Sequence, residues 1–284
     1  MSLKERFEIT PGFRKWSLGL IGIGVLSLII GYIVYGTGDE VHQARFWGVL
    51  LHNSIYFLLI TNAVMFFFCA TTLSLAGFQV SFKRVTEAIS ACVPVIGGIT
   101  FLVMLCIVFG HKSMIYEWLD KAAVAKDAAL TGKKGFLNPG FFLTWTVLAI
   151  GLWSILGYKM RSMSRKTDDH PLSVEEGKKF MFKNTIWASL FIIWYALTIA
   201  AVIPWLWLMS LNAHWYSTLY SWYIFASSFV AGIALISVFV VYMKNKGYLQ
   251  FTNKEHLHDL GKFQFAFSIF WTYLWFAQFM LLWY

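Results

Sequence analysis

Seven long apolar segments dominate this chain of 284 residues, and none of them has Asp, Glu, Lys or Arg at its centre. A helix of about 20 apolar residues crosses the hydrocarbon core of a bilayer. Because lipid cannot hydrogen-bond to the backbone, each segment is expected to be helical. The segments cover approximately residues 16–36, 47–79, 85–110, 140–160, 184–211, 222–243 and 263–284. The sequence therefore predicts an all-α integral membrane protein with about seven transmembrane helices.

Composition agrees with lipid as the solvent for much of the surface. The chain is 58% hydrophobic and 13% charged, whereas soluble proteins carry about 25% charged residues. The net charge of +9 could suggest a nucleic-acid ligand. However, the basic residues form short runs beside the apolar segments rather than one basic surface, so nucleic acid is not an expected partner.

The basic residues also predict the orientation in the membrane. Of the 23 Lys and Arg residues, 17 lie on the N-terminal side: in the N-terminus and in the loops 80–84, 158–183 and 244–262. Loops facing the cytoplasm are enriched in Lys and Arg. The N-terminus is therefore predicted to be cytoplasmic.

A polar loop divides the predicted segments into two groups. Residues 1–160 are expected to form a first helical bundle of four spans, followed by a cytoplasmic loop at 161–183. Residues 184–284, with three spans, are expected to be part of a second bundle. The last segment ends on Leu-Leu-Trp-Tyr without a polar residue, which predicts that the natural chain continues.

A group of polar side chains lies near the membrane face opposite the N-terminus. The group comprises His42, His52, Asn53, His111 and His214. Imidazoles beside aromatic rings could form a quinol pocket, in which a histidine accepts the quinol proton. The same residues could instead be interfacial side chains with a polar tip, which is the interpretation we favour. A b-type haem needs two facing histidines well inside a bundle, and these lie near its ends.

A second group of titratable residues lies on the N-terminal side and could take up protons. It comprises Glu87, His256, His258 and Asp259, with Asp168, Asp169 and His170 in the polar loop. Solvated loop charge is the simpler interpretation for most of them. Glu87 is expected to pair with Lys83 or Arg84 near the start of its helix. On a helix, His256 and His258 would point in nearly opposite directions, so they predict no metal site.

Motifs for catalysis or cofactor binding are absent from the sequence. It contains no Gly-rich phosphate loop, H-E-x-x-H or G-x-S-x-G motif. Cys69, Cys92 and Cys106 form no C-x-x-C or C-x-x-C-H arrangement, which argues against covalent c-type haem and cysteine-held zinc or iron–sulfur sites. We therefore predict that this chain binds no metal or redox cofactor.

Several short aromatic-rich motifs together resemble one family of respiratory subunits. They are LHNS at 51–54, FKRVTEA at 82–88, KGFLNPGFF at 134–142, AHWYSTLYSWYIFAS at 213–227, HLHDLGKF at 256–263 and SIFWTYLWFAQFMLLWY at 268–284. Their order resembles that of the F subunit of bacterial alternative complex III, a quinol:cytochrome c (or other periplasmic acceptor) oxidoreductase. That subunit is similar to the NrfD-like, or polysulfide-reductase, membrane proteins.

The resemblance implies two four-helix bundles within a longer chain in the bacterial inner membrane. It implies, as partners, a multihaem cytochrome c subunit, an iron–sulfur subunit, a second NrfD-like subunit and small membrane-anchored subunits. The c-type haems and iron–sulfur clusters belong to those partners, and menaquinol is the implied substrate. Quinol oxidation is implied for the other NrfD-like subunit, which leaves this one a structural role and a proton path. No catalytic residue transfers to this sequence.

Two other classes of function remain open from the sequence. A secondary transporter would need helices broken near the membrane centre, and the segment that begins at Pro94 and ends with Gly97 and Gly98 predicts one such break. A quinol-binding or haem-b anchor subunit of another oxidoreductase would use the histidines described above.

Overall fold

The computed structural model describes residues 9–168 and 172–283, and no β-strand occurs within these ranges. Within the described ranges, seven helical stretches are long and apolar enough to cross a membrane, as predicted. They are Pro11–Gly36, Glu40–Leu73, Gly77–Phe109, Pro139–Lys166, Val174–Leu211, Thr218–Asn245 and Lys254–Trp283.

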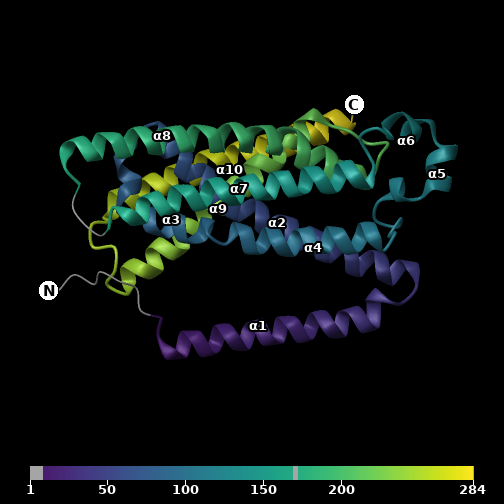
Figure 1. Ribbon diagram of the computed structural model, residues 1–284, viewed down its shortest axis with the longest axis horizontal. Helices are drawn as coiled ribbons and strands as arrows, with labels where there is room; N and C mark the ends of the chain where they lie inside the picture. The colour runs from purple at the N-terminus through teal and green to yellow at the C-terminus, as the bar shows by residue number, and fades with distance from the viewer. Residues whose placement is uncertain (1–8, 169–171, 284) are drawn as a thin grey trace.

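Most of these stretches are built from regular α-helices (Figure 1). The long helices are α1 (Pro11–Gly31), α2 (Glu40–Leu73), α4 (Val93–Phe109), α7 (Pro139–Lys166), α8 (Val174–Leu197), α9 (Thr218–Asn245) and α10 (Lys254–Trp283), and the short ones are α3 (Lys83–Ser90), α5 (Lys121–Lys126) and α6 (Ala128–Lys133). π-helical segments follow α1 (η1, Tyr32–Gly36) and α8 (η4, Thr198–Leu208), and 3₁₀ turns lie at Gly77–Phe82 (η2), Glu117–Leu119 (η3) and Met209–Leu211 (η5).

The helices extend beyond the apolar segments that predict them. α7 has 28 residues, or about 42 Å of helix, whereas the hydrocarbon core is about 30 Å thick. The irregular part of the predicted loop 161–183 is therefore shorter than expected, because α7 ends at Lys166 and α8 begins at Val174.

The helix that corresponds to the predicted segment 47–79 begins and ends earlier in the chain than predicted. α2 begins at Glu40, capped by Asp39, and ends before a turn in which Leu75 has a positive φ of 53°.

α2 lies at the centre of the molecule. It packs against α3, α4, α8 and α9, and its middle is buried almost all the way round. α7 packs against both α4 and α8, and α10 packs along α9. α2 thus shares a core with helices from both halves of the chain, and the division into two four-helix bundles stays a prediction.

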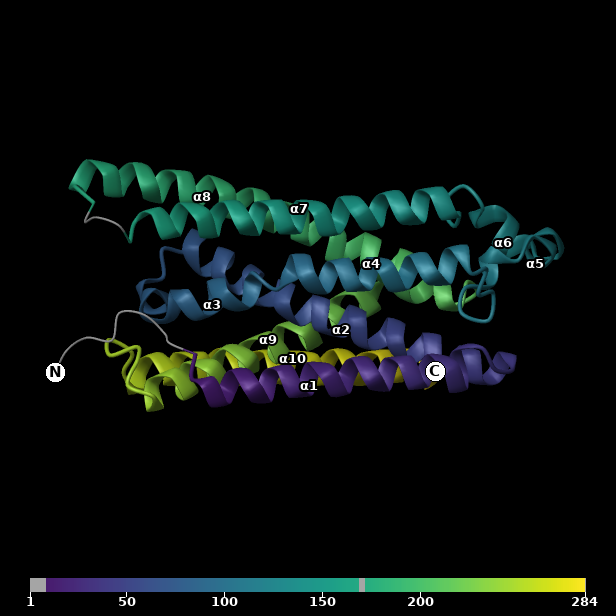
Figure 2. The same cartoon turned by 60° about the horizontal axis from the view of Figure 1, so that its bottom comes forward.

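α1 stands apart from the other helices in Figure 1, and in the turned view of Figure 2 it lies in front of α9 and α10. None of its residues is buried, and large apolar side chains point outward from all its sides. It meets the rest of the molecule near its last turn, where Gly31 lies against the Phe46 ring of α2. Such a surface is stable only against lipid or another apolar partner.

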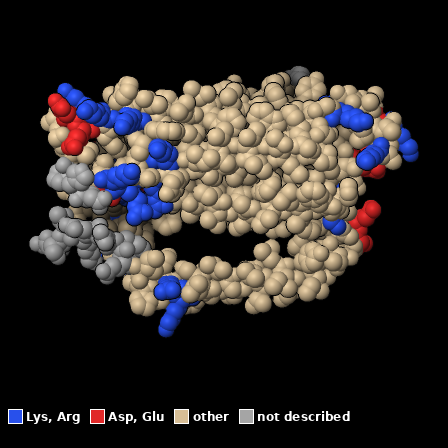
Figure 3. Space-filling model, viewed as in Figure 1, with Lys and Arg blue, Asp and Glu red and all other residues tan. Residues whose placement is uncertain are grey.

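Charged side chains gather at the two ends of the helices and leave the middle of the visible face uncharged (Figure 3). One end carries α3 and the start of α8, and we call it the Glu87 end. The opposite end carries α5 and α6, and we call it the His214 end (Figure 1). This distribution is expected of a protein that crosses a bilayer.

Gly97 allows the closest approach between α4 and α7. A Cβ atom at Gly97 would lie 2.5 Å from the Ile150 Cγ2 atom, whereas one at Gly98 would meet nothing within 4 Å. Gly97→Leu is therefore expected to reduce the free energy of unfolding by about 1–3 kcal/mol through overpacking. Thermal unfolding in detergent measures the effect, with Gly98→Leu as the matched control. Equal unfolding midpoints for the two variants would contradict this packing.

Candidate functional site

Glu87 is buried in an ion-pair cluster at the Glu87 end. Its side chain is 3% exposed, and its Oε2 atom accepts a hydrogen bond from Arg84 Nη1 at 2.6 Å. Its Oε1 atom lies 3.7 Å from Lys83 Nζ. The predicted pairing with Lys83 or Arg84 is confirmed, and it involves both. Arg84 also pairs with Asp168 and donates to the Ser164 hydroxyl at 3.0 Å, which ties α3 to the end of α7.

Neighbouring helices hold this cluster in place. The Lys83 ammonium lies over the ring of Phe68 from α2 at 5.6 Å and over that of Phe180 from α8 at 5.2 Å. Arg84 and Asp168 are partly exposed. The cluster therefore connects a solvated edge to a carboxylate inside the protein. Two basic and two acidic groups balance in charge, as a buried carboxylate requires.

Further inside, several buried polar atoms lack a hydrogen-bond partner among the described residues. Asn62 of α2 is 0% exposed, and neither its amide nitrogen nor its amide oxygen is paired. The same holds for Asn184 Oδ1 on α8 and for Trp153 Nε1 on α7, whereas the Tyr195 hydroxyl of α8 lies within reach of Ser228 of α9. By contrast, the hydroxyl of the neighbouring Thr61 is paired, because it donates to the carbonyl of Phe57 in its own helix. Buried polar groups in proteins are rarely unpaired, so each of these needs an explanation.

These groups lie on the inward faces of packed helices. The buried residues of α8 are Asn184, Ala188, Phe191 and Tyr195, which form one stripe at helical spacing. Asn184 is one turn from Phe180, the ring beneath Lys83. Tyr195 lies about 16 Å further along the axis and stacks on Phe66 of α2 at 4.9 Å. Asn62 is one turn from Phe66 on α2.

We call Glu87, Asn184, Asn62, Trp153 and Tyr195 the inner polar groups. Along α8, Asn184 lies nearer the ion-pair cluster and Tyr195 lies about three turns further toward the middle of the bundle. The spacing between them exceeds one hydrogen bond, so water would have to connect them. Glu87 is the one carboxyl group among them, while the others can form hydrogen bonds with water.

The residues predicted at the His214 end lie apart from one another. No hydrogen bond, ion pair or ring contact joins any two of His52, Asn53, His111 and His214, all of which the structure describes. Each is exposed. His52 stacks on Tyr56 at 6.4 Å, and Asn53 donates to the Val49 carbonyl at 2.8 Å. His111 follows the end of α4 with a positive φ of 45°, where helices commonly end in a left-handed residue.

The predicted residues near α10 serve mainly to begin that helix. The backbone amide of Asn253 donates to His256 Nδ1 at 3.0 Å, and the His256 amide donates to Asn253 Oδ1 at 3.1 Å. Asp259 pairs with Lys262 at 3.2 Å, and His258 is exposed. No group of three or more His, Cys, Asp or Glu residues suits a metal ion in the parts of the chain that the structure describes. Asp169 and His170 lie outside those parts.

At the His214 end, Asp127 connects two loops. Its carboxylate accepts bonds from the amides of Ala129 and Leu130, which begin α6, and lies 2.7 Å from His214 Nε2. Partial burial opposes ionisation, but the two amides and His214 outweigh it and lower the pKa of Asp127 below its usual value. The carboxylate therefore stabilises the fold above its unfolded pKa, and this contribution is lost as the pH falls through the folded pKa.

Asp127→Asn is expected to remove this part of the acid sensitivity. Between pH 7 and pH 3, the thermal unfolding midpoint should fall less in the variant than in the natural protein. Asp120→Asn is the control, because Asp120 caps α5 through the Ala122 amide at 2.8 Å without a histidine partner. Identical pH profiles for the natural protein and Asp127→Asn would show that the contact with His214 contributes nothing.

Besides Glu87, which the sequence already marks as a candidate, the sequence carries one further signal for the inner polar groups. Asn62 is an amide in the middle of an apolar run, and such residues are costly in a membrane unless they have partners or a function. Asn184, Trp153 and Tyr195 resemble ordinary residues of apolar helices, and only the packing of α7 and α8 reveals them.

Comparison with known proteins does not assign the chain to a family. No protein-family model matches it, and no curated protein is significantly similar to it. What the chain does is therefore inferred from its own residues and from the ordered motifs described above.

Proposed function

We propose that this chain is a multi-pass membrane subunit of a bacterial inner-membrane quinol:acceptor oxidoreductase and that it conducts protons from the Glu87 end into the membrane. The ordered motifs that resemble the F subunit of alternative complex III support the place in the complex. The inner polar groups support the proton path. With the N-terminus in the cytoplasm, Glu87 faces the side from which such a complex would take up protons.

The fully buried and unpaired amide of Asn62 carries the proton-path proposal. An unpaired buried amide costs about 1–3 kcal/mol, which a helix at the centre of the fold would avoid by carrying an apolar residue. Water bound to the amide offsets that cost, since buried waters typically make about three hydrogen bonds to polar groups. Glu87 would exchange protons with the exposed edge at Arg84 and Asp168, and ordered water would carry them inward.

Electron transfer is assigned to other subunits. We propose that a multihaem cytochrome c, an iron–sulfur protein, a second NrfD-like subunit and small membrane-anchored subunits bind this chain. Menaquinol would be oxidised on the second NrfD-like subunit, and this chain would hold no haem or iron–sulfur cluster of its own.

Copurification tests the place in the complex. An affinity tag on this chain should recover c-type haem and iron–sulfur proteins after mild solubilisation, detected by mass spectrometry and by haem absorbance. Recovery of the chain alone, as a stable monomer, would contradict the proposal. A Soret band from the isolated chain would instead support a haem-b anchor subunit.

A secondary transporter is the second candidate, and interrupted helices favour it. The third span is interrupted at Ala91 and Cys92, just before the predicted break at 94–98, which is helical, and the fifth continues from α8 into an 11-residue π segment that contains Pro204. Interrupted helices commonly form transporter sites. Uptake of a solute by vesicles that hold only this chain would favour the transporter over the complex subunit.

A further inference from the structure

Two cavities adjoin beside the π segment η4. The outer cavity, of about 460 Å³, lies near the membrane edge at the His214 end, between the end of α6 and the connection from η4 to α9. The inner cavity, of about 290 Å³, lies deeper among α2, α8, η4 and α9. Trp205 and Thr218 line both cavities. Together they form one groove, which we call the Trp205 groove.

The π segment shapes this groove. π-helical turns are wider than α-helical turns and are frequent at functional sites. Pro204 has no amide hydrogen, and the Ser221 hydroxyl of α9 donates to the Ala200 carbonyl, four residues earlier, at 2.9 Å. Trp205 then projects to the outside, 48% exposed, and Trp222 of α9 stands opposite it, 58% exposed. The groove therefore opens sideways, toward lipid.

The two ends of the groove differ in charge. The inner cavity is lined mostly by aromatic and aliphatic side chains, including Phe66, Tyr195 and Phe225. The outer cavity is also largely apolar, but its wall includes one charged residue, Lys133, and the hydroxyl-bearing residues Ser210, Tyr216, Ser217 and Thr218. This order, a positive charge at the membrane edge and apolar side chains further in, matches an amphiphile lying along the membrane normal.

Lys133 is held in place and keeps its charge available. Its ammonium group donates to the Ala213 carbonyl, which leaves two further N–H donors. The nearby carboxylate of Asp127 is engaged by the amides of α6 and by His214. The wall of the outer cavity is therefore positive, and it complements a phosphate rather than a cation or a neutral headgroup.

We propose that the Trp205 groove binds one anionic phospholipid. The phosphate lies beside Lys133, and one acyl chain passes Trp205 into the cavity lined by Tyr195 and Phe225. A zwitterionic lipid would fit the apolar part equally well, so Lys133 supplies the preference for negative charge. Of the inner polar groups, only Tyr195 lines this site, and all the lining residues belong to this chain.

Native mass spectrometry of the purified protein, with phosphatidylglycerol or phosphatidylcholine added, tests the site. The natural protein should keep one phosphatidylglycerol after extensive washing. Lys133→Gln should lower the preference for phosphatidylglycerol about fivefold, the effect of one basic residue near a membrane surface. Lys134→Gln, the adjacent lysine outside the groove walls, should not. Ala196→Phe, which fills the inner cavity, should remove binding of both lipids.

A crosslinking measurement on the natural protein covers the case in which a variant does not fold. Phosphatidylglycerol with a photoreactive acyl chain should label peptides that contain Trp205 or Phe225 more than those from α1. Equal labelling of α1, or the same lipid preference in Lys133→Gln and Lys134→Gln, would overturn the proposal and leave only general lipid contact.

Discussion

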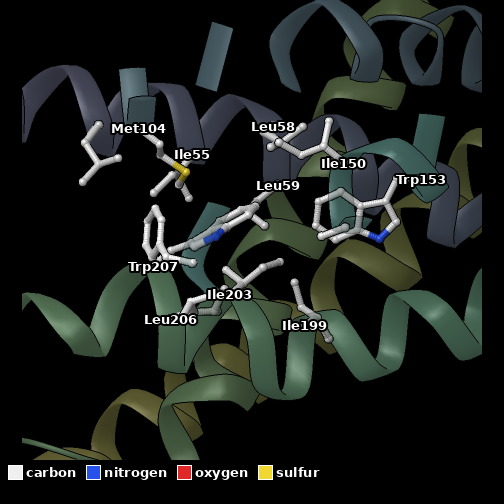
Figure 4. Packing of buried hydrophobic residues seen from close by; sticks show 14 of the residues in the cluster. Ile55, Leu58, Leu59, Met104, Ile150, Trp153, Ile199, Ile203, Leu206 and Trp207 are labelled. Atoms are coloured by element: carbon white, nitrogen blue, oxygen red, sulfur yellow. The ribbon is translucent and has the colours of Figure 1, made fainter. Parts of the chain in front are cut away.

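Replacing Trp207 by alanine is expected to destabilise the protein by about 3–5 kcal/mol, the usual range for removing a buried tryptophan. Trp207 is 0% exposed, and its ring meets that of Trp153 edge-on at 6.3 Å. It packs among residues of α2, α4 and α7 (Figure 4). Lipid provides no hydrophobic force between helices. The loss of stability therefore comes from the cavity that the substitution leaves and from the contacts of the ring that are removed.

Two hydrogen bonds add to the effect of this substitution. The Trp207 indole donates to the Thr146 hydroxyl at 2.9 Å, and the Trp207 carbonyl accepts from Tyr116 OH at 2.8 Å. The first bond is lost in the variant, and a shift of the backbone would weaken the second. Trp207 therefore fixes the π segment to α7 and to the loop after α4.

Thermal unfolding in detergent measures this prediction, with Trp16→Ala as the control. Trp16 lies on α1 and is 77% exposed, so its loss should leave the unfolding midpoint nearly unchanged. A small effect of Trp207→Ala, similar to that of the control, would mean that η4 is not packed as the structure shows.

Local sequence patterns predict the spans and the Glu87 ion pairs, because both depend on residues close together in the chain. Apolar length reveals a transmembrane helix directly, and the pairs between Glu87 and Lys83 or Arg84 join neighbours on one helix turn. Orientation follows from charge alone, and the cytoplasmic N-terminus stays a prediction.

Long-range packing is what the sequence did not predict. Arg84 reaches Ser164, and Tyr116 reaches Trp207, across 80 and 91 residues. The burial of Asn62 depends on α8 and α9 lying against α2. The π segment was missed because one proline in an apolar run is compatible with a kinked helix as well. Likewise, the apolar composition of α1 predicts a span but not its separation from the other helices.

Asn62→Leu is expected to separate function from stability. Leucine removes the unpaired amide, so the unfolding midpoint should stay the same or rise. If Asn62 orders water for proton transfer, the variant should lose most of the proton translocation. Thr61→Val is the matched control, because Thr61 is also buried but already donates to backbone carbonyls of α2 at 3.0 Å.

The most direct test of the proton path is the number of protons taken up per quinol oxidised by the purified complex in sealed vesicles. Protons released by quinol oxidation itself are subtracted. The ratio should fall toward zero for Asn62→Leu, while Thr61→Val keeps the natural ratio and both variants oxidise quinol. An unchanged ratio for Asn62→Leu in an intact complex would contradict a proton path through the inner polar groups.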